Sequence, residues 1–421
     1  MNKYDIVVAG GGTAGCAAAY TAGKLGLKTL LIEKNIHLGG TITSGLVIPV
    51  MKSGDNQINT DFFNELILEL QTIGGQVTYQ NNRGWFNPEL AKIALDNLMQ
   101  KAGVDVSFGV EIQNVLLVNK EIKSICIKNK ILSEHIDKLH NALSANIETR
   151  YVIDATGDCE IGKICNCDFG ENFETQPVSL RFIMSGINIP KFTAWLKDFD
   201  TDRDVTTVEN IDGVIHLSTA YTWDSNKKWA LAPLFEDAIE REVLKDTDRN
   251  YFQIFTIAGM PDAVAFNCPR VVDKLDYSSA LVSARQSIYR LANFCKIYFP
   301  GFKNAYISNM ADMLGVRVSN RIKGRYIYTI DDLKSGKKFK NPVVISNYPV
   351  DIHSQERNTS TLQLVQDYQL PIESLMSADI DNLFVAGRCL SADFKAQGAL
   401  RVQSSCFSMG EGIAKYIANL Q

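Results

Sequence analysis

Three glycines near the start of the chain have the types and spacing needed to bind phosphate. Gly10, Gly12 and Gly15 form G-x-G-x-x-G directly after a short apolar segment. In such a motif one glycine permits a tight turn, one lets the backbone approach a pyrophosphate, and one allows close helix–strand packing. The following helix offers unpaired N–H groups and its positive dipole end to the phosphates. The pattern predicts a dinucleotide site that includes Thr13 and Ala14.

An acidic residue completes this unit. Segment 29–32 has the composition of a second buried strand, and it ends on Glu33, followed by Lys34. Glu33 stands 18 residues after Gly15, close to the spacing of about 20 expected for a carboxylate that accepts from ribose hydroxyls. Because strand, helix, second strand and acid occur in order, ordinary turn glycines are a poor alternative. We therefore count Glu33 and Lys34 among the cofactor contacts.

The composition sets outer limits on the function. A length of 421 residues predicts two or three domains, and 46% hydrophobic with 21% charged residues is typical of a globular protein. The net charge of −4 argues against a nucleic-acid partner. No segment approaches the roughly 18 apolar residues of a membrane span. The first strand begins within a few residues of Met1 and the nine cysteines are odd in number, so we expect no signal peptide and a cytoplasmic location.

The elements that must position this site follow from periodicity. Segments 62–72 and 87–102 have helical periodicity, and the second opens with an asparagine cap and a proline. Segment 104–129 predicts three strands, with Asn119 and Lys120 as a hairpin turn between the last two. The polar segment 129–149 is expected to be a surface excursion, and a strand at 151–153 follows it.

The second half of the chain changes character. Segment 175–350 mixes alternating strand patterns with one long amphipathic helix around 279–294, which indicates a second domain. A buried strand at 382–386 and a closing helix at 404–420 return to an α/β pattern. We therefore expect one nucleotide-binding domain assembled from residues 1–174 and 355–421, with a substrate-binding (cap) domain, 175–354, inserted between its two parts.

Four sequence blocks carry a family resemblance. They are the glycine unit with Glu33, the loop LGGTITSG (38–45), the segment VIDATGD (152–158), and the terminal block NLFVAGRCLSADFKAQGALRVQ and its helix (382–414). Together they resemble the FAD-dependent oxidoreductase family related to the succinate dehydrogenase and fumarate reductase flavoproteins, within the glutathione-reductase-like FAD fold. Two departures from the family pattern are Phe394, where a histidine is frequent, and Glu411, where a small residue is frequent.

The resemblance implies an α/β fold class. It consists of a Rossmann-like FAD-binding domain with a parallel sheet and β-meander, plus an inserted α+β substrate or cap domain. The implied cofactor is noncovalent FAD, and the implied turn at 398–402 aims a helix N-terminus at the flavin. Beyond the first unit, the implied contacts are Gly39, Gly40, Thr41, Ala155, Thr156, Gly157, Asp158, Gly387, Arg388, Gly398, Arg401 and Val402.

Histidine and arginine supply the candidates for catalysis. His353 in YPVDIH is the best acid–base candidate because the usual histidine pKa lies near neutrality, and a purely structural histidine is its alternative. Arg317, Arg321 and Arg325 recur every four residues, which on a helix would form one positive stripe. That stripe would clamp a substrate carboxylate, pair with acids between domains, or be solvated. Arg181 and Arg270 are further anion candidates.

The cysteines predict no metal centre. Cys159, Cys165 and Cys167 have a spacing that fits neither a zinc pair nor C-x-x-C, so packing residues are expected. Cys16 is interpreted as a small buried filler. Cys389 is either a core residue or a flavin contact.

The chain is thus predicted to be an FAD-dependent oxidoreductase, a dehydrogenase or reductase that exchanges hydride between flavin N5 and a small organic substrate. His353 would move the proton and Arg317 or Arg321 would hold an anionic group. A flavin oxidase or monooxygenase using oxygen, a flavin-bearing subunit serving an electron-transfer partner, and a non-catalytic FAD-binding protein remain as alternatives. Because a second G-x-G-x-x-G after a strand is absent, a dedicated pyridine-nucleotide domain is not expected.

Overall fold

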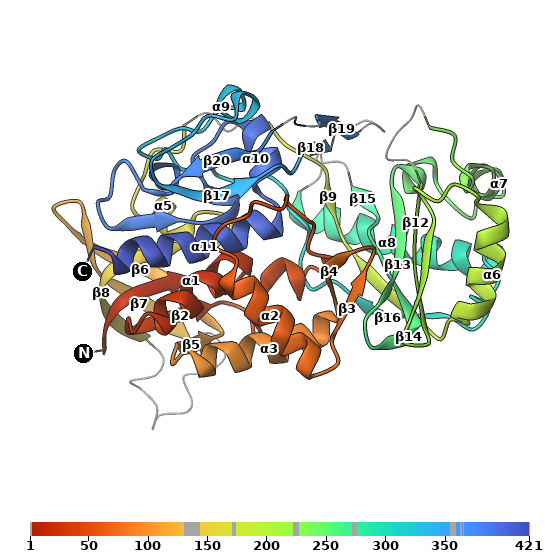
Figure 1. The fold of residues 1–421 in the computed structure, drawn as a ribbon, viewed down its shortest axis with the longest axis horizontal. Coiled ribbons are helices and arrows are strands. Elements are labelled where there is room, and N and C mark those ends of the chain that lie inside the picture. The colour runs from red at the N-terminus through yellow and green to blue at the C-terminus, as the bar shows by residue number, and fades with distance from the viewer. Residues whose placement is uncertain are drawn as a thin grey trace.

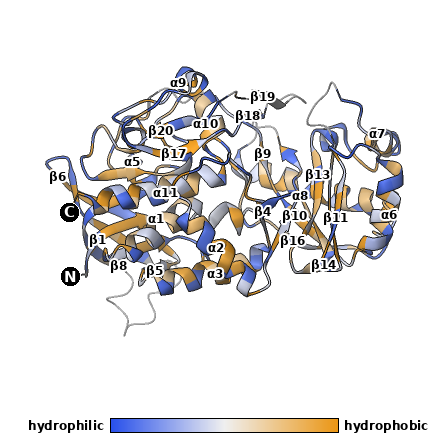
Figure 2. Cartoon of the chain, viewed as in Figure 1, coloured by the Kyte–Doolittle hydropathy of each residue, from blue (hydrophilic) through white to orange (hydrophobic). Residues whose placement is uncertain are grey.

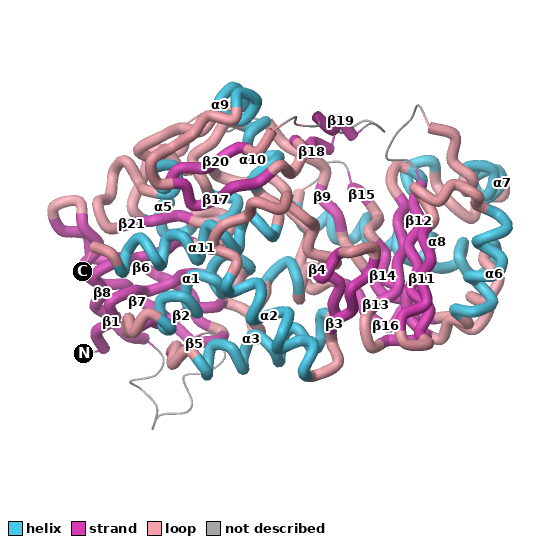
Figure 3. The backbone as a smooth tube through the Cα atoms, in the orientation of Figure 1, coloured by secondary structure: helices cyan, strands magenta, loops and turns pink. Residues whose placement is uncertain are grey.

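A computed structural model describes residues 2–129, 144–170, 174–221, 227–271, 276–353, 359–362, 364 and 366–420. Most of the expected surface excursion at 129–149 lies outside these residues. Two sheets lie toward opposite ends of the molecule, and both termini lie beside the larger one (Figure 1, Figure 3).

The larger sheet has seven strands in the order β5-β2-β1-β8-β7-β6, with β21 paired to β8. Its strands are β1 (Asn2–Ala9), β2 (Thr29–Glu33), β5 (Asp105–Phe108), β6 (Val110–Val118), β7 (Glu121–Asn129), β8 (Ser144–Asp154) and β21 (Leu383–Val385). Strands β5, β2, β1, β8 and β21 are parallel, while β6, β7 and the start of β8 form an antiparallel meander. This confirms the predicted mixed α/β architecture.

Successive residues of β1 point to opposite faces of this sheet, and both faces are buried. This is expected for parallel strands that are covered on both sides. Ile6 and Val8 join the larger hydrophobic core, whereas Val7 and Ala9 join a second core on the other face. Figure 2 shows the resulting hydrophobic character of β1.

Helices cover the side of the sheet that carries the larger core. They are α1 (Thr13–Lys24), α2 (Asp61–Thr72), α3 (Pro88–Lys101) and α11 (Gln403–Ala418). The short α5 (Glu160–Ile164) follows β8 and places Ile161 in the second core, on the other face. A β-carbon on Gly410 would lie 2.0 Å from the carbonyl oxygen of Ala14, so α11 approaches α1 as closely as backbones can. Asn87 caps α3 through its side-chain oxygen, as the sequence predicts.

The predicted hairpin turn is also present between β6 and β7. Asn119 and Lys120 adopt φ of 51° and 64°. A two-residue hairpin turn of type I′ requires such left-handed values at both central residues. A separate hairpin of β3 (Gln76–Tyr79) and β4 (Asn82–Phe86) precedes α3.

The second sheet has six antiparallel strands in the order β11-β12-β13-β14-β10-β16. They are β10 (Phe182–Ser185), β11 (Thr207–Ile211), β12 (Val214–Tyr221), β13 (Phe252–Ile257), β14 (Met260–Phe266) and β16 (Tyr306–Met310). The helices α6 (Ile189–Phe199), α7 (Ala232–Glu240) and α8 (Tyr277–Tyr298) accompany it. Aromatic contacts such as Phe252 with Phe294, 6.3 Å between ring centroids, join this sheet to α8.

Short elements lie above α11 in the view of Figure 1 or between the two sheets. They are β9 (Val178–Ser179), β15 (Arg270–Val271), α9 (Ile330–Ser335), β17 (Pro342–Ser346), β18 (Val350–His353), β19 (Thr359–Leu362), β20 (Tyr368–Pro371) and α10 (Phe394–Leu400). Strand β17 contacts α11. This part of the expected cap segment therefore lies against the helices of the seven-stranded sheet. Within the described ranges, none of the helices combines the length and apolar character needed to cross a bilayer.

The prediction of a helical arginine stripe is wrong. No helix is formed between β16 and α9, where the three arginines lie. The backbone instead bonds to distant segments: Ile322 donates to the carbonyl of Cys389 at 3.0 Å, and Arg325 donates to that of Met376 at 3.0 Å. Because these bonds replace those of a helix, the arginine side chains diverge.

Candidate functional site

Four parallel strands end at one edge of the seven-stranded sheet. The chain runs from β1 into Gly10, and it leaves β2 at Glu33, β8 at Asp154 and β21 at Val385. Ligands of open α/β sheets bind at this carboxyl edge. A cavity there is lined mainly by residues the sequence singles out: Gly10, Gly12, Thr13, Ala14, Glu33, Lys34, Gly40, Thr41, Ala155, Thr156, Gly157, Asp158, Gly387, Arg388 and Arg401.

The glycine loop is shaped by close backbone contacts. A β-carbon on Gly15 would lie 1.9 Å from the oxygen of Gly10, and Gly10 itself has φ of +94°. At Gly12 an added β-carbon would meet nothing within 4 Å. Gly10 and Gly15 therefore serve packing, while Gly12 leaves open space at the start of α1.

The second glycine loop lies against the first. The N–H of Gly39 donates to the oxygen of Gly11 at 2.8 Å, and a β-carbon on Gly40 would lie 3.0 Å from Cα of Gly12. Gly39 supports the loop from behind, since it is not among the residues lining the cavity. Gly40 and Thr41 face the cavity.

Glu33 connects the glycine loop to the end of β2. Its Oε2 accepts from the N–H of Gly11 at 2.7 Å, and its Oε1 accepts from the N–H and Nδ2 of Asn35 at 2.8 and 2.7 Å. Each carboxylate oxygen can accept more than one hydrogen bond. Glu33 is thus held in place and can still accept from a hydroxyl group in the cavity.

Asp154 is a positioning residue that the sequence reasoning missed. Its buried carboxylate accepts from the N–H and Oγ1 of Thr156 and from the N–H groups of Ile161 and Gly162, at 2.6–3.2 Å. Burial raises its pKa although these bonds act to lower it. An aspartate two residues before a threonine at a strand end was the available signal. Asp154 fixes the loop that supplies one wall of the cavity.

Positive side chains also border the cavity. Arg388 donates from Nη1 to the oxygen of Val316 at 2.8 Å, and its Nη2 lies 3.3 Å from Oδ1 of Asp158. Lys34 forms an ion pair with Glu160 at 3.1 Å. Carboxylate or carbonyl groups hold Arg388 and Lys34 beside the glycine loops. The positive charges of the two side chains would attract an anionic group there.

The residues present fit an FAD. The space at Gly12 and the N-terminus of α1 suit a pyrophosphate, and Glu33 suits a ribose. Farther along, buried polar atoms have no partner among the described residues: Oγ of Ser405, Oε1 of Gln397 and Nε of Arg401. Unsatisfied buried polar atoms are uncommon in native structures. Of these three residues Arg401 lines the cavity, so its Nε could donate to a polar group of the bound cofactor.

The predicted contacts at 398–402 need correction. Gly398 lies within α10, and a β-carbon there would meet Cγ1 of Ile352 at 3.2 Å, so Gly398 packs against β18. The turn is confined to Arg401 and Val402. Arg401 lines the cavity while Val402 does not. Gln403, which was not predicted, lines the cavity beside Arg401.

His353 lies in a partly buried polar cluster next to Arg401. Its Nδ1 is 2.8 Å from Nη2 of Arg270, and its Nε2 is 3.2 Å from Oδ2 of Asp351. Because guanidinium nitrogens only donate, Nδ1 accepts and Nε2 carries the proton. Burial, followed by the charge of Arg317, lowers the pKa of His353 to about 3. The expected titration near neutrality is therefore wrong, because the ring is held neutral.

Arg317 is the arginine of the three that reaches this cluster. Its Nη1 donates to the oxygen of Pro177 at 2.5 Å. Burial and then the charges of Arg401 and Arg270 lower its pKa well below the usual value. Arg321 and Arg325 lie elsewhere. Arg321 donates to the oxygen of Ala392 and pairs with Glu174 at 3.5 Å, and the exposed Arg325 pairs with Asp381 at 3.6 Å.

The cysteines pack in the core. Cys159, Cys167 and Cys389 belong to the second hydrophobic core, with Cys165 against it. A hydrogen bond to Cys389 and burial raise the pKa of Cys159 far above its usual range. Cys16 is fully buried and donates to the oxygen of Gly11 at 3.1 Å. Cys406, not Cys389, is the cysteine that lines the cavity.

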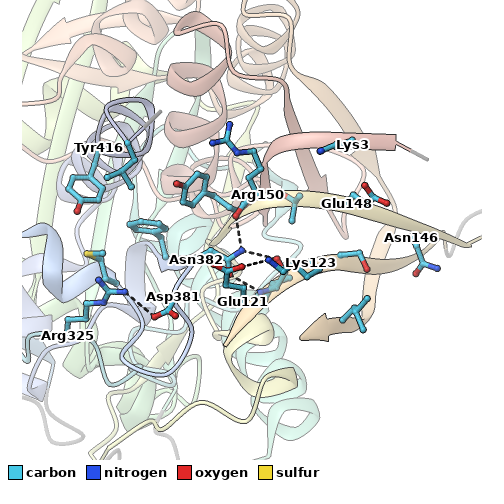
Figure 4. A pocket seen from close by; sticks show the side chains of 18 residues that line it. Lys3, Glu121, Lys123, Asn146, Glu148, Arg150, Arg325, Asp381, Asn382 and Tyr416 are labelled. Carbon is cyan, nitrogen blue, oxygen red and sulfur yellow. Dashed lines mark hydrogen bonds and ion pairs between the residues drawn. The ribbon is translucent and has the colours of Figure 1, made fainter. Parts of the chain in front are cut away.

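A larger groove lies at the opposite, amino-terminal part of the sheet (Figure 4). Its polar side chains bond mainly with one another or with the backbone. Asn382 donates to the oxygens of Ile122 and Arg150 at 2.8 Å, and Arg325 pairs with Asp381. The groove is remote from the glycine loops and presents no convergent acid–base pair.

The sequence has partial similarity to two curated enzymes. It is 29% identical over 181 residues to a digeranylgeranylglycerophospholipid reductase of Thermoplasma acidophilum, which covers 39% of this chain and 42% of that protein. It is 29% identical over 163 residues to a thiamine thiazole synthase of Sulfolobus acidocaldarius, covering 38% and 57% respectively. The matches span about half the length of these relatives.

Two solved structures share the overall fold. A geranylgeranyl bacteriochlorophyll reductase-like protein from Thermoplasma acidophilum has a TM-score of 0.51 at 16% identity, covering 100% of this chain and 79% of that one. The p-nitrophenol 4-monooxygenase from Pseudomonas putida has a TM-score of 0.51 at 8% identity, covering 100% and 81%. The model of the family described as FAD dependent oxidoreductase matches residues 5–419. The chain therefore belongs to the FAD-dependent oxidoreductase family.

Proposed function

We propose that this enzyme exchanges a hydride with a small organic substrate held between its two sheets, beside Arg401 and Arg317. The observation that carries the proposal is the position of Arg401. Its side chain lines the cofactor cavity, and its Nη2 also lies 3.1 Å from the oxygen of Asp351, inside the polar cluster. The side chain of Arg401 therefore connects the predicted FAD site with the charged groups of the polar cluster around His353.

FAD, when bound, supplies hydride transfer at N5, and the protein supplies binding and electrostatics. Gly12, Thr13 and Arg388 would hold the pyrophosphate and Glu33 the ribose. Arg317 would anchor an anionic group of the substrate. In place of a titrating catalyst, His353 would be a positioning residue that fixes Asp351 and Arg270 through its two ring nitrogens.

The relation to succinate dehydrogenase and fumarate reductase flavoproteins, the division at 174 and 354, and a separate electron-transfer partner remain predictions. Oxygen-dependent chemistry is the competing function within the same cofactor class. Both functions need the same FAD cavity, so cofactor binding alone does not separate them.

The test is a spectral titration of the purified protein. We expect a yellow protein whose flavin is photoreduced and then reoxidised slowly in air but quickly by an organic acceptor. Rapid reoxidation by air with product hydroxylation or peroxide release would favour the oxygen-dependent function. A protein that remains colourless after incubation with FAD would contradict the proposal altogether.

A further inference from the structure

The β3–β4 hairpin connects the two halves of the molecule. It lies between α2 and α3 in the sequence, yet its tip contacts β11 of the second sheet. The hydroxyl of Tyr79 hydrogen-bonds with that of Thr207 at 2.5 Å, and the N–H and Nε2 of Gln80 donate to the carboxylate of Glu209 at 3.1 and 2.8 Å. Figure 1 shows the hairpin beside the second sheet.

Aromatic rings add to this contact. Trp85 of β4 packs edge-to-face against Phe255 of β13 with 5.2 Å between ring centroids, and Tyr79 packs in the same way against Trp85 at 5.1 Å. Edge-to-face contacts are favourable and depend on geometry. The hairpin is therefore docked on the second sheet by polar and apolar contacts together.

His216 of β12 lies buried beneath the docked hairpin. It is 5% exposed, its ring centroid is 6.2 Å from that of Tyr79, and its Nδ1 is 3.3 Å from Oγ1 of Thr256 on β13. Glu209 stands directly opposite it on β11. Burial raises the pKa of Tyr79 to about 12, so this phenol is neutral. Among the described residues, Glu209 is the charged group that acts on His216.

A proton on His216 would favour release of the hairpin. Burial, opposed by the charge of Glu209, lowers the pKa of His216, because a buried cation beneath Tyr79 is costly. While the hairpin is docked, Gln80 occupies the carboxylate of Glu209. Release would return the imidazole to water and free Glu209 to pair with it, and opposite charges that face each other across two strands attract.

The hairpin is also connected to the FAD cavity. The N–H of Val50 donates to the oxygen of Gly84 in β4 at 2.9 Å, and Nδ2 of Asn82 donates to the oxygen of Val50 at 3.0 Å. Three residues earlier, the oxygen of Val47 accepts from Nε2 of Gln403 at 2.9 Å. Because Gln403 lines the cavity, one short segment joins the hairpin to the cofactor site.

We propose that the β3–β4 hairpin is a pH-sensitive latch, which docks on the second sheet while His216 is neutral and leaves it when His216 takes up a proton. The released state binds one more proton than the docked state. The ratio of released to docked hairpin should therefore rise as the pH falls below about 6.5, by at most about tenfold per pH unit. Release would loosen the segment that holds Gln403.

Hydrogen exchange of the FAD-loaded protein, followed by mass spectrometry at pH 7 and pH 5, tests the latch. After correction for the intrinsic effect of pH on exchange, we expect the protection of amides 76–86 to fall about tenfold at pH 5. The amides of α3 are the internal control and should keep their protection. Equal protection of the hairpin at both pH values would overturn the proposal. Hydrogen exchange requires no turnover, so this outcome would leave the proposed redox function standing.

Variants assign the effect to His216. His216→Phe keeps an aromatic ring beneath Tyr79 but cannot titrate, so protection of the hairpin should no longer depend on pH. Thr207→Val, the matched control, removes a docking contact without removing the histidine, and it should lower protection by the same factor at both pH values. A pH dependence that persists in His216→Phe would contradict the proposal.

Glu209→Gln provides a second test should His216→Phe fail to fold. Without the carboxylate, protonated His216 loses its partner across the two strands, so release of the hairpin should require a lower pH. A midpoint of release equal to that of the parent would contradict the exchange of partners at Glu209.

Discussion

Nη2 of Arg270 donates to Nδ1 of His353 at 2.8 Å, and this contact decides the protonation state of the histidine. A proton on Nδ1 would face a permanent cation, so the ring stays neutral and its second nitrogen serves Asp351. The position that the sequence suggests for proton transfer is therefore occupied on both sides by protein partners.

Replacement of His353 should change how stability depends on pH. In the unfolded chain this histidine binds a proton below about pH 6.5, whereas in the folded protein its pKa is about 3. The unfolded state therefore binds more protons between these values, and stability must fall as the pH is lowered through that window. The slope is at most about 1.4 kcal/mol per pH unit.

Urea denaturation of the FAD-loaded protein from pH 7 to pH 4 measures this effect. His353→Asn keeps an acceptor for Arg270 but removes the titration, so its stability should fall less steeply than that of the parent. If the free energy of unfolding falls equally with pH in the parent and in the variant, His353 titrates normally in the folded state.

Asp154→Asn should loosen the wall of the FAD cavity. An amide in place of the carboxylate presents N–H groups to the donors of Ile161 and Gly162, which now bond to Oδ2. Leaving such buried donors unsatisfied costs about 1–3 kcal/mol. We expect a lower Tm and at least tenfold weaker FAD binding, measured by flavin fluorescence. Asp381→Asn, at an exposed ion pair, is the control and should change neither value.

Local signals explain why the cofactor half of the site is predictable. The glycine spacing, the Asn87 cap and the Asn119 turn each depend on neighbours a few residues apart, and the structure contains the helix and turn they specify. Strand ends then meet at one edge by the geometry of parallel sheets. Sequence reasoning needs no tertiary contact for these features.

The substrate half depends on distant contacts. The spacing of Arg317 and Arg321 suits a helix, yet the segment contains β-branched residues and Gly324, and it bonds to the carbonyls of other segments. Arg270 reaches His353 across 83 positions. No periodicity within the chain specifies such a meeting.

Glu411→Gln should destabilise the fold without affecting FAD. Glu411 is a departure from the family pattern, and its fully buried carboxylate accepts from the N–H of Phe62 at 2.9 Å and pairs with Lys415 at 2.7 Å. It therefore joins the start of α2 to α11. Because Lys415 keeps 39% exposure and water screens the ion pair, its loss should cost about 1 kcal/mol, read as a lower urea midpoint. Lys415→Met is a matched partner, and unchanged midpoints in both variants would refute the role.

Two alanine substitutions in the glycine loop should have opposite consequences for folding. Gly15→Ala places a β-carbon 1.9 Å from the oxygen of Gly10, so α1 and the loop must separate. Overpacking costs about 1–3 kcal/mol or more, and little folded protein is expected.

Gly12→Ala meets no atom within 4 Å, and its φ of −74° suits alanine. This variant should fold with an unchanged Tm in the absence of FAD, yet lose FAD binding at least tenfold, because the methyl group occupies the space where the pyrophosphate would approach. Circular dichroism and flavin fluorescence distinguish the two, and normal FAD binding by Gly12→Ala would place the pyrophosphate elsewhere.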